Sequence, residues 1–319
     1  MAFIGKRLVI TILTLFMVSI LCFAAFRLIP GDAALLSLGV EATDEQIEFL
    51  RSEMGLEKSP PAQYLSWLGK FLTGNLGNSS RFRGSSISGI LAARLPVTFT
   101  LAGISFIFII LIAVPVSLFW AKRENSFPGH FITSLTALNI SMPGFFLGIL
   151  IIWIFGILLK LFVPGEFVSY RESPAAFLGC LIFPGLAIAL PNAALVVKFL
   201  CSSIFRELHS DYVRTARSKG GSRSYILRRH VLKNASLPVI TLLGMIAGEI
   251  FSGSIVIEQV FAIPGIGRLL IAAIGSRDYP LIQTLVMFIA FIFIIANTLT
   301  DIAIQVIDPR IRLEGNIQP

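Results

Sequence analysis

Six long apolar runs constrain the fold of this chain more than any other feature of its sequence. Each is long enough to cross a hydrocarbon layer of about 30 Å at about 1.5 Å of rise per helical residue. With 55% hydrophobic and only 14% charged residues, the chain also lies outside the range of soluble globular proteins. The sequence therefore predicts an all-α polytopic membrane protein with six transmembrane helices. The runs are Leu8 to Phe26, Thr98 to Trp120, Leu135 to Leu159, Phe177 to Val197, Pro238 to Ile257 and Leu281 to Ile307.

Basic residues flank these runs in an order that predicts the topology. Six spans place both termini on the same side of the membrane. Lys and Arg accumulate in cytoplasmic loops, and every basic cluster here is cytoplasmic if the N-terminus is. We therefore expect both termini in the cytoplasm. Outside the central loop, the clusters are Lys6 with Arg7, Lys122 with Arg123, and Arg310 with Arg312.

The segment from Asp211 to Thr241 is a basic island between the fourth and fifth runs. Its seven cations would together cost on the order of 20 kcal/mol at mid-bilayer, so the island must be a cytoplasmic loop. Composition alone favours a solvated loop held to anionic lipid headgroups. The cations are Arg214, Arg217, Lys219, Arg223, Arg228, Arg229 and Lys233.

The island has the pattern of two short helices joined by a turn. Ile204, Leu208, Tyr212 and Ala216 recur every four residues, which predicts one helix continuing from the fourth span. Gly220 and Gly221 interrupt this helix. Ser222 can cap a second helix that runs toward Leu232, ahead of a fifth span opened by Pro238.

The polar segment from Pro30 to Arg94 lies outside in this topology. Thr43 with Gln46 forms a capping box at the start of a predicted helix, and Gly55 is a candidate stop at the end of this helix. A second amphipathic segment follows from Tyr64 to Leu72, and Gly74 to Gly89 has the composition of an irregular loop. The segment is either a cap packed on the spans or a lid or docking surface, and the sequence leaves both open.

Within the spans, prolines predict kinks or breaks in the helices, and glycines predict close contacts between helices. Pro115, Pro184 and Pro191 are candidate kinks, and Met142–Pro143–Gly144 is a candidate break in the third span. Gly244 and Gly248 form a GxxxG pair, extended by Ser252, that predicts close helix packing.

Several function classes lack the residues that they need. The net charge of +8 is divided among membrane-flanking loops, so we expect no nucleic-acid partner. Three cysteines, Cys22, Cys180 and Cys201, have no CxxC spacing and are expected as small buried hydrophobes. We find no phosphate-binding GxxxxGK[ST] loop, no HExxH motif and no metal cluster. Ser105 could act as an intramembrane nucleophile only with a general base at the same depth, and all three histidines lie in cytoplasmic segments. No enzymatic centre is therefore expected. The first run is longer than a usual signal core and lacks an A-x-A site, which favours an uncleaved span.

The basic island resembles the EAA loop of ABC-importer permeases, and more narrowly that of the dipeptide, oligopeptide and nickel permeases. Where the general motif has Glu-Ala-Ala, this chain has Arg214, Thr215 and Ala216, and where it has Ile-x-Leu-Pro the chain has His230 to Lys233. Both departures are typical of the peptide and nickel subfamily. The matching loop residues are Asp211 to Gly220, Arg229, His230, Leu232, Asn234, Ala235 and Pro238.

The resemblance extends over nearly the whole chain. Each further match is short, and their common order carries the resemblance. They are Pro30 to Asp32, Glu45 to Ile47, Gly55 with Leu56, Gln63, Tyr64, Trp67, Leu68, Gly74 to Gly77, Arg94 to Pro96, Thr98, Glu258, Val260, Phe261, Pro264, Gly265, Gly267, Arg268, Arg277 to Pro280, and Asp308 to Arg310.

The resemblance implies a type I ABC-importer permease in a bacterial inner membrane, with no catalytic centre and no cofactor of its own. Its implied partners are a second homologous permease, two cytoplasmic ATPase subunits that bind ATP and Mg, an extracytoplasmic solute-binding protein, and membrane lipid. Two copies of this chain could replace the pair of different permeases. The implied cargo is a di- or oligopeptide, with nickel or a metal chelate as the alternative. The coupling residues expected from this resemblance are Arg214, Thr215, Ala216, Lys219, Gly220, Gly221 and Ser222.

Polar residues within the spans are candidates to line a translocation path. Glu249 is the clearest, because an ionisable group at membrane depth is a functional candidate by default, although a hydrogen bond to a neighbouring helix explains it equally well. The weaker candidates are Asn139, Ser141, Asn192 and Ser252, with Asp301. A secondary transporter or channel would share the kinked bundle, but it usually couples to ions through paired carboxylates, which a lone Glu249 does not supply.

We expect four regions along the chain. Residues 1–29 form the N-terminal transmembrane helix and residues 30–94 the extracytoplasmic region. Residues 95–310 form a five-helix permease core that contains the coupling loop at 201–235. Residues 311–319 form a cytoplasmic tail.

Overall fold

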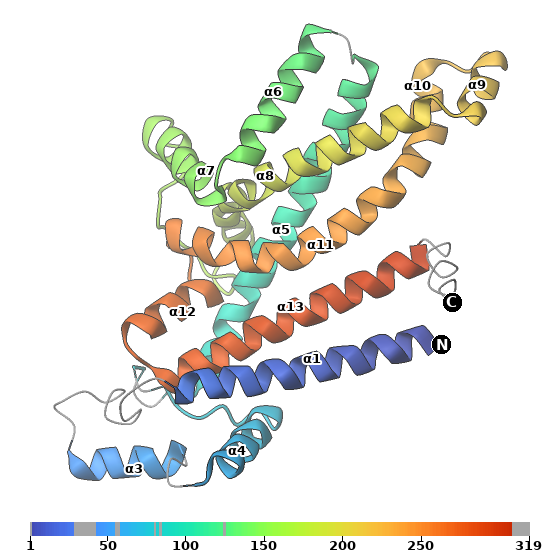
Figure 1. Cartoon of the computed structure of the whole chain (residues 1–319). Helices are drawn as coiled ribbons and strands as arrows, with labels where there is room; N and C mark the ends of the chain where they lie inside the picture. The colour runs from blue at the N-terminus through green and yellow to red at the C-terminus, as the bar shows by residue number, and fades with distance from the viewer. Residues whose placement is uncertain are drawn as a thin grey trace. The chain divides into compact units, whose positions relative to one another are not determined.

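The structure, a computed structural model, describes residues 2–28, 43–54, 58–79, 81–82, 85–123 and 126–307. These residues form helices, with one isolated bridge between Asn78 and Ser86, which confirms the all-α prediction. The expected matches at Pro30 to Asp32, Gly55 with Leu56 and Asp308 to Arg310, the cluster at Arg312 and the tail at 311–319 lie outside the described residues. Figure 1 shows the helices in chain order. They are α1 (Ala2–Arg27), α3 (Asp44–Met54), α4 (Pro60–Leu72), α5 (Ile87–Lys122), α6 (Phe127–Ser141), α7 (Gly144–Ile151), the π-helix η1 (Ile152–Leu158), α8 (Pro174–Leu208), α9 (Asp211–Ser218), α10 (Arg223–Ile226), the π-helix η2 (Leu227–Val231), α11 (Leu232–Val260), α12 (Ile266–Gly275) and α13 (Tyr279–Ile307).

Five of the predicted spans are single helices long and apolar enough to cross a membrane, and the third is a bent pair. The chain bends by 107° between helices Phe127–Ser141 and Gly144–Leu158. The bend follows from Pro143, because a residue before proline is disfavoured in the helical region, and Met142 is extended with φ −86° and ψ 130°. The predicted break at Met142–Pro143–Gly144 is therefore confirmed. The other three prolines named as candidate kinks lie inside α5 and α8 without ending either helix.

Two compact units divide the chain, Met1–Phe99 with Ile263–Ile295 and Thr100–Ala262 with Ala296–Pro319. The core of the first unit gathers around the start of α5, α12 and the start of α13. Its buried residues are Ile87, Leu91, Ile266, Leu269, Ala273, Leu281, Ile282 and Leu285. These side chains pack the three helix segments together.

Helix α4 packs on α1 within the first unit. Tyr64 forms a 2.7 Å hydrogen bond with Ser19 and makes an edge contact with Phe23. Trp67 lies beside Phe23, with ring centroids 6.0 Å apart. The capping box before α3 is confirmed, since the Thr43 amide donates to Gln46 Oε1 and the Gln46 amide to Thr43 Oγ1. This packing fits the cap interpretation of the polar segment between the first two spans.

Asp278 ties the loop after α4 to the start of α13. Its carboxylate is fully buried and accepts from the Ser79 hydroxyl and from the Arg81 and Leu281 amides. The bond to Leu281 caps α13, and the other two hold the segment that the sequence indicated only as an irregular loop. Charge-assisted bonds of this kind are about twice as strong as neutral ones, so the loop is held against the helix.

Helix α8 is the centre of the second unit, where it packs against α6, α7 and α11. Close contacts at glycines set the spacing of these helices. A Cβ at Gly185 would lie 2.9 Å from Ile104 Cγ2, and a Cβ at Gly148 would lie 3.2 Å from the Phe261 ring. A larger side chain at either glycine would force its neighbour to move, so both positions favour glycine.

The GxxxG pair of α11 packs on the last part of α13. A Cβ at Gly244 would lie 2.0 Å from Thr300 Cγ2, and one at Gly248 would lie 2.5 Å from Asn297 Oδ1. The Thr300 hydroxyl also donates to the Gly244 carbonyl over 3.1 Å. The predicted use of Gly244 and Gly248 in close packing is confirmed, as is typical of small residues between membrane helices.

Candidate functional site

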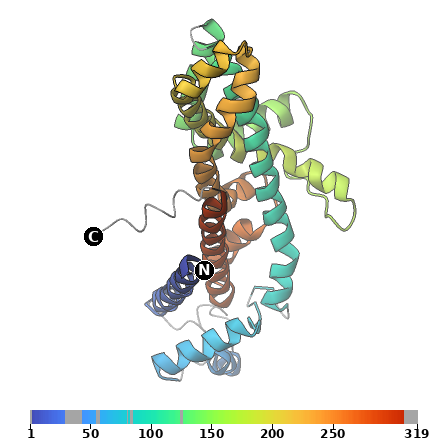
Figure 2. The ribbon, with the colours of Figure 1, turned by 90° about the vertical axis from the view of Figure 1, so that its right-hand side faces the viewer.

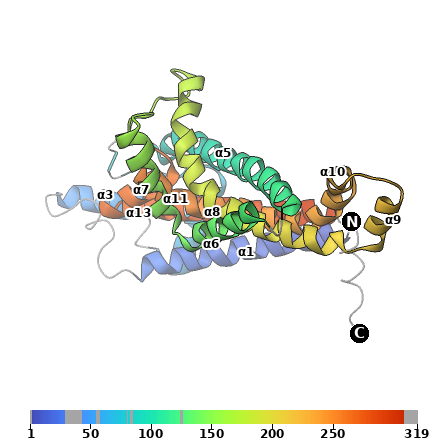
Figure 3. The ribbon, with the colours of Figure 1, turned by 90° about the horizontal axis from the view of Figure 1, so that it is seen from above.

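The basic elbow (residues 211–231) comprises α9, a turn, α10 and η2, and it lies at one end of the pair α8 and α11 (Figures 1 and 3). The start of α6 and the end of α5 lie at this same end (Figure 2). A hydrogen bond of 3.1 Å from Arg223 to the Ala121 carbonyl joins the elbow to α5. The basic pair Lys122 with Arg123 is thus on the side of the elbow, as the charge pattern predicts.

Apolar residues anchor the elbow to the rest of the unit. Val213, Ile226, Leu227 and Val231 are between 0 and 2% exposed. The four-residue repeat did not predict that Val213 is buried, because we interpreted the repeat as one helix continuing from α8 through Ala216. The structure corrects this: α8 ends at Leu208 and α9 begins at Asp211, which shifts the buried face.

The turn between α9 and α10 requires both of its glycines. Gly220 has φ +83°, a conformation that residues with a Cβ rarely adopt. Gly221 donates to the Ala216 carbonyl over 3.2 Å, and a Cβ there would lie 3.0 Å from the same oxygen. Ser222 caps α10 by accepting from the Tyr225 amide, as predicted. The turn therefore has a fixed shape.

The second predicted helix of the island is not separate from the fifth span. Helix α10 passes through η2 directly into α11, and Pro238 lies inside α11 instead of opening it. Proline removes one backbone donor but does not force an end where neighbouring helices support the chain. From Arg223 onward, the elbow and α11 are consequently one continuous helical segment.

The outer surface of the elbow is polar and exposed. Arg214 pairs only loosely with Asp211, at 3.7 Å, and 78% of its side chain is exposed. Thr215, Lys219, Gly220 and Ser222 are exposed, and Ala216 and Gly221 are half-buried. The seven predicted coupling residues therefore lie together on one turn and on the helix before it, where another protein can reach five of them freely.

A polar cavity of about 390 Å³ separates α9 from the start of α11. Its lining residues are Tyr212, Arg229, His230, Lys233 and Asn234. Burial raises the pKa of Tyr212, and its 2.7 Å hydrogen bond to the Glu207 carboxylate raises it further. Tyr212 thus remains a proton donor at neutral pH and ties α9 to the end of α8.

The candidate path residues are not joined to one another in the described part of the chain. Asn139, Ser141 and Asn192 each donate to the carbonyl four residues earlier in their own helix. Glu249 and Ser252 lie on an exposed stripe of α11. Its other members are Met245, Gly253, Val256 and Gln259. Among the described residues of the second unit, therefore, no other helix covers Glu249.

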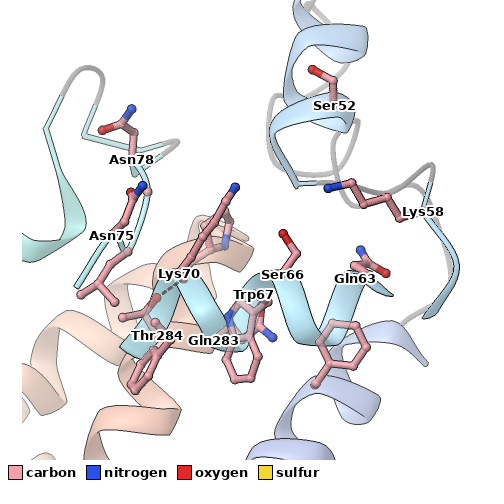
Figure 4. Close-up of a pocket in the computed structure, with 15 residues that line it drawn as sticks. Ser52, Lys58, Gln63, Ser66, Trp67, Lys70, Asn75, Asn78, Gln283 and Thr284 are labelled. Atoms are coloured by element: carbon pink, nitrogen blue, oxygen red, sulfur yellow. Dashed lines mark hydrogen bonds between the residues drawn. The ribbon is translucent and has the colours of Figure 1, made fainter. Parts of the chain in front are cut away.

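A second cavity, of about 270 Å³, lies in the first unit beside α4. Figure 4 shows Ser66 and Lys70 rising from α4 between Lys58 on one side and Asn75 and Asn78 on the other. The amines, amides and hydroxyl can bind polar groups and favour an anionic one. The sequence did not indicate this cavity, because it depends on how α3, α4 and α13 come together. Among the described residues, no group of His, Cys, Asp and Glu could hold a metal ion.

Comparison with known proteins identifies the family. Residues 113–313 match the family described as binding-protein-dependent transport system inner membrane component, and residues 1–102 match its N-terminal family. The chain belongs to the binding-protein-dependent transport system inner membrane components. These components are permease subunits, so the chain is a multi-pass inner-membrane protein and not itself an enzyme.

Relatives of this inner membrane component align over almost their full length. A Brucella ovis protein named as a peptide permease is 38% identical over 96% of this chain and 98% of its own. A Sinorhizobium fredii protein named as a peptide ABC transporter permease is 34% identical, over 97% and 99%. The oligopeptide transport system permease protein AppB of Bacillus subtilis is 32% identical, over 97% and 99%.

Proposed function

We propose that this inner membrane component is one permease subunit of an ATP-driven importer of di- or oligopeptides. The observation that carries the proposal is the basic elbow. It is anchored by buried side chains, continuous with α11 and exposed on the side that a cytoplasmic partner would approach. Because the sequence contains no phosphate-binding loop, a separate ATPase must supply the nucleotide chemistry.

The coupling contact is formed by Arg214, Thr215, Ala216 and the turn from Lys219 to Ser222. Two ATPase subunits close on ATP, and one of them presses on this surface. The fixed turn passes the displacement to α8 and α11, whose movement alternates access to the path. The elbow is cytoplasmic in this arrangement, and so are both termini.

A second homologous permease covers the exposed stripe of α11. Glu249 is central in the predicted fifth span and exposed in the isolated chain. A charged side chain facing lipid at mid-bilayer costs about 2.5–3.5 kcal/mol, so this stripe faces protein or a water-filled path. With Ser252, Asn139, Ser141 and Asn192, Glu249 supplies polar groups for the passage of the solute. A solute-binding protein delivers this solute on the opposite side from the elbow.

The names of the relatives favour peptides over nickel chelates as cargo. We propose residues 1–29, 30–94, 95–310 and 311–319 as the functional regions of this permease. Residues 201–235 form the coupling loop.

Uptake by reconstituted vesicles tests the proposed function. The chain is reconstituted with its partner permease, ATPases and binding protein, and uptake of labelled di- and oligopeptides is measured. We expect accumulation that requires ATP, persists with an uncoupler and is not reduced by a nickel chelate. Accumulation that continues without ATP and collapses with the uncoupler would assign the chain to secondary transporters.

A further inference from the structure

An apolar groove of about 380 Å³ lies between α5, α8 and α11 in the second unit. Ala113 of α5, Val196 and Leu200 of α8, and Val239 of α11 are buried and form its floor. Ile110, at 38% exposed, and the partly exposed Leu243 stand at its sides.

The polar groups of this groove gather at one end. Arg228 of η2 and Lys233 of α11 line it and are exposed, and Ser236 lies one turn beyond Lys233. Among the described residues that line the groove, none is Asp or Glu. The groove is therefore apolar along its length and positively charged at the end next to the basic elbow.

Its length matches one leaflet of a bilayer. Lys233 and Leu243 are ten residues apart on α11, which at about 1.5 Å per residue is roughly 15 Å. A hydrocarbon core of about 30 Å gives each leaflet about the same 15 Å. The cations thus sit where headgroups lie if Leu243 reaches the middle of the membrane.

We propose that this groove binds one anionic phospholipid of the cytoplasmic leaflet. The phosphate accepts hydrogen bonds from Arg228 and Lys233, and one acyl chain lies along the apolar floor. The proposal rests on the orientation given under the proposed function, which places the elbow in the cytoplasm. Basic pockets between membrane helices on this side suit acidic headgroups.

A lipid fits the groove better than a protein helix does. A partner helix would have to cover Arg228 and Lys233, and burying two cations is costly unless the partner supplies acids. The phospholipid carries its own negative charge next to its apolar chain. Bound there, it would join the elbow to α5 and α8 through contacts that this chain does not make by itself.

Native mass spectrometry of the full-length chain, purified with its partner subunits, tests this site with phosphatidylglycerol as the probe. Phosphatidylcholine with the same acyl chains is the neutral comparison. We expect retention of phosphatidylglycerol, with phosphatidylcholine bound about tenfold more weakly or worse. The double variant Arg228→Gln/Lys233→Gln should lower phosphatidylglycerol binding by about tenfold or more.

Two further variants separate this site from general attraction to the membrane. Ile110→Trp fills the groove but keeps both cations, and it should also release the lipid. Arg217→Gln removes one positive charge from exposed α9. Because Arg217 lines neither the polar cavity of the elbow nor the apolar groove, this variant should retain the lipid.

Any of four results overturns the proposal. Equal retention of phosphatidylcholine would show that charge plays no part, and equal loss in Arg217→Gln would show unspecific attraction. Retention by Ile110→Trp would place the lipid elsewhere. Cross-linking of a cysteine at Ile110 to the second permease would show that protein fills the groove. Because lipid retention is measured without transport, its failure is distinguishable from failure of peptide uptake.

Discussion

Gly220→Trp is expected to abolish ATP-driven uptake and to weaken association with the ATPase subunits by about tenfold or more, while the chain still reaches the membrane. The physical reason is steric. No heavy atom lies within 4 Å of a Cβ placed at Gly220, so the indole would project away from the elbow into the space that the ATPase must occupy. Co-purification of the ATPase and uptake into vesicles measure the effect.

Gly220→Asn is the matched control, because Gly220 has φ +83° and any side chain strains the backbone there. Asn tolerates this conformation better than most residues, and its side chain is small. We expect Asn to keep most of the association that Trp removes. Normal uptake by Gly220→Trp would contradict the coupling contact, and equal damage by both variants would trace the effect to the shape of the turn.

Gly244→Ala is expected to destabilise the second unit by about 1–3 kcal/mol, the usual cost of overpacking a tight contact. The added Cβ would lie 2.0 Å from Thr300 Cγ2, so the Thr300 side chain or the two helices must shift. This change overrides the gain in helix propensity of about 1 kcal/mol that alanine brings. The thermal unfolding midpoint of the purified chain should fall by several degrees.

Two variants isolate the contact as the cause. Gly253 lies on the same helix with nothing within 4 Å of its Cβ position, so Gly253→Ala should leave the midpoint unchanged or raise it. Adding Thr300→Ser to Gly244→Ala removes the clashing methyl but keeps the hydroxyl that donates to the Gly244 carbonyl, and it should restore much of the loss. An unchanged midpoint in Gly244→Ala would contradict the close packing.

Features set by local chemistry were predicted well from the sequence. The apolar runs gave the helices, because the membrane demands about 20 apolar residues per span. Pro143 located the bend of the third span, and Thr43 with Gln46 located the capping box. Each of these signals involves residues that are close together in the chain.

The errors arose where local signals competed. A four-residue repeat suggested a continuous helix from Ile204 to Ala216, but the chain breaks at His209 and Ser210. Ser210 followed by Asp211 is a typical helix start and could have revealed the break. Pro238 suggested a helix start, but the helix from η2 continues through it, because packing supports a proline inside a membrane helix.

Sites that depend on distant residues could not be predicted. The lipid groove combines residues from Ile110 to Leu243, and the cavity beside α4 combines residues from Phe23 to Thr284. No periodicity or motif connects these positions. The coupling residues could be proposed only because they occupy one short loop whose pattern resembles a known family.

We propose that the basic elbow is a cytoplasmic surface covered by an ATPase, and labelling of the Lys219→Cys variant tests this most directly. Lys219 is exposed, whereas Cys22 and Cys201 are buried, so Lys219→Cys is made together with Cys180→Ser. A membrane-impermeant maleimide should label this variant in inside-out vesicles, less so when the ATPase subunits are present, and not in right-side-out vesicles. Labelling in right-side-out vesicles would contradict the account.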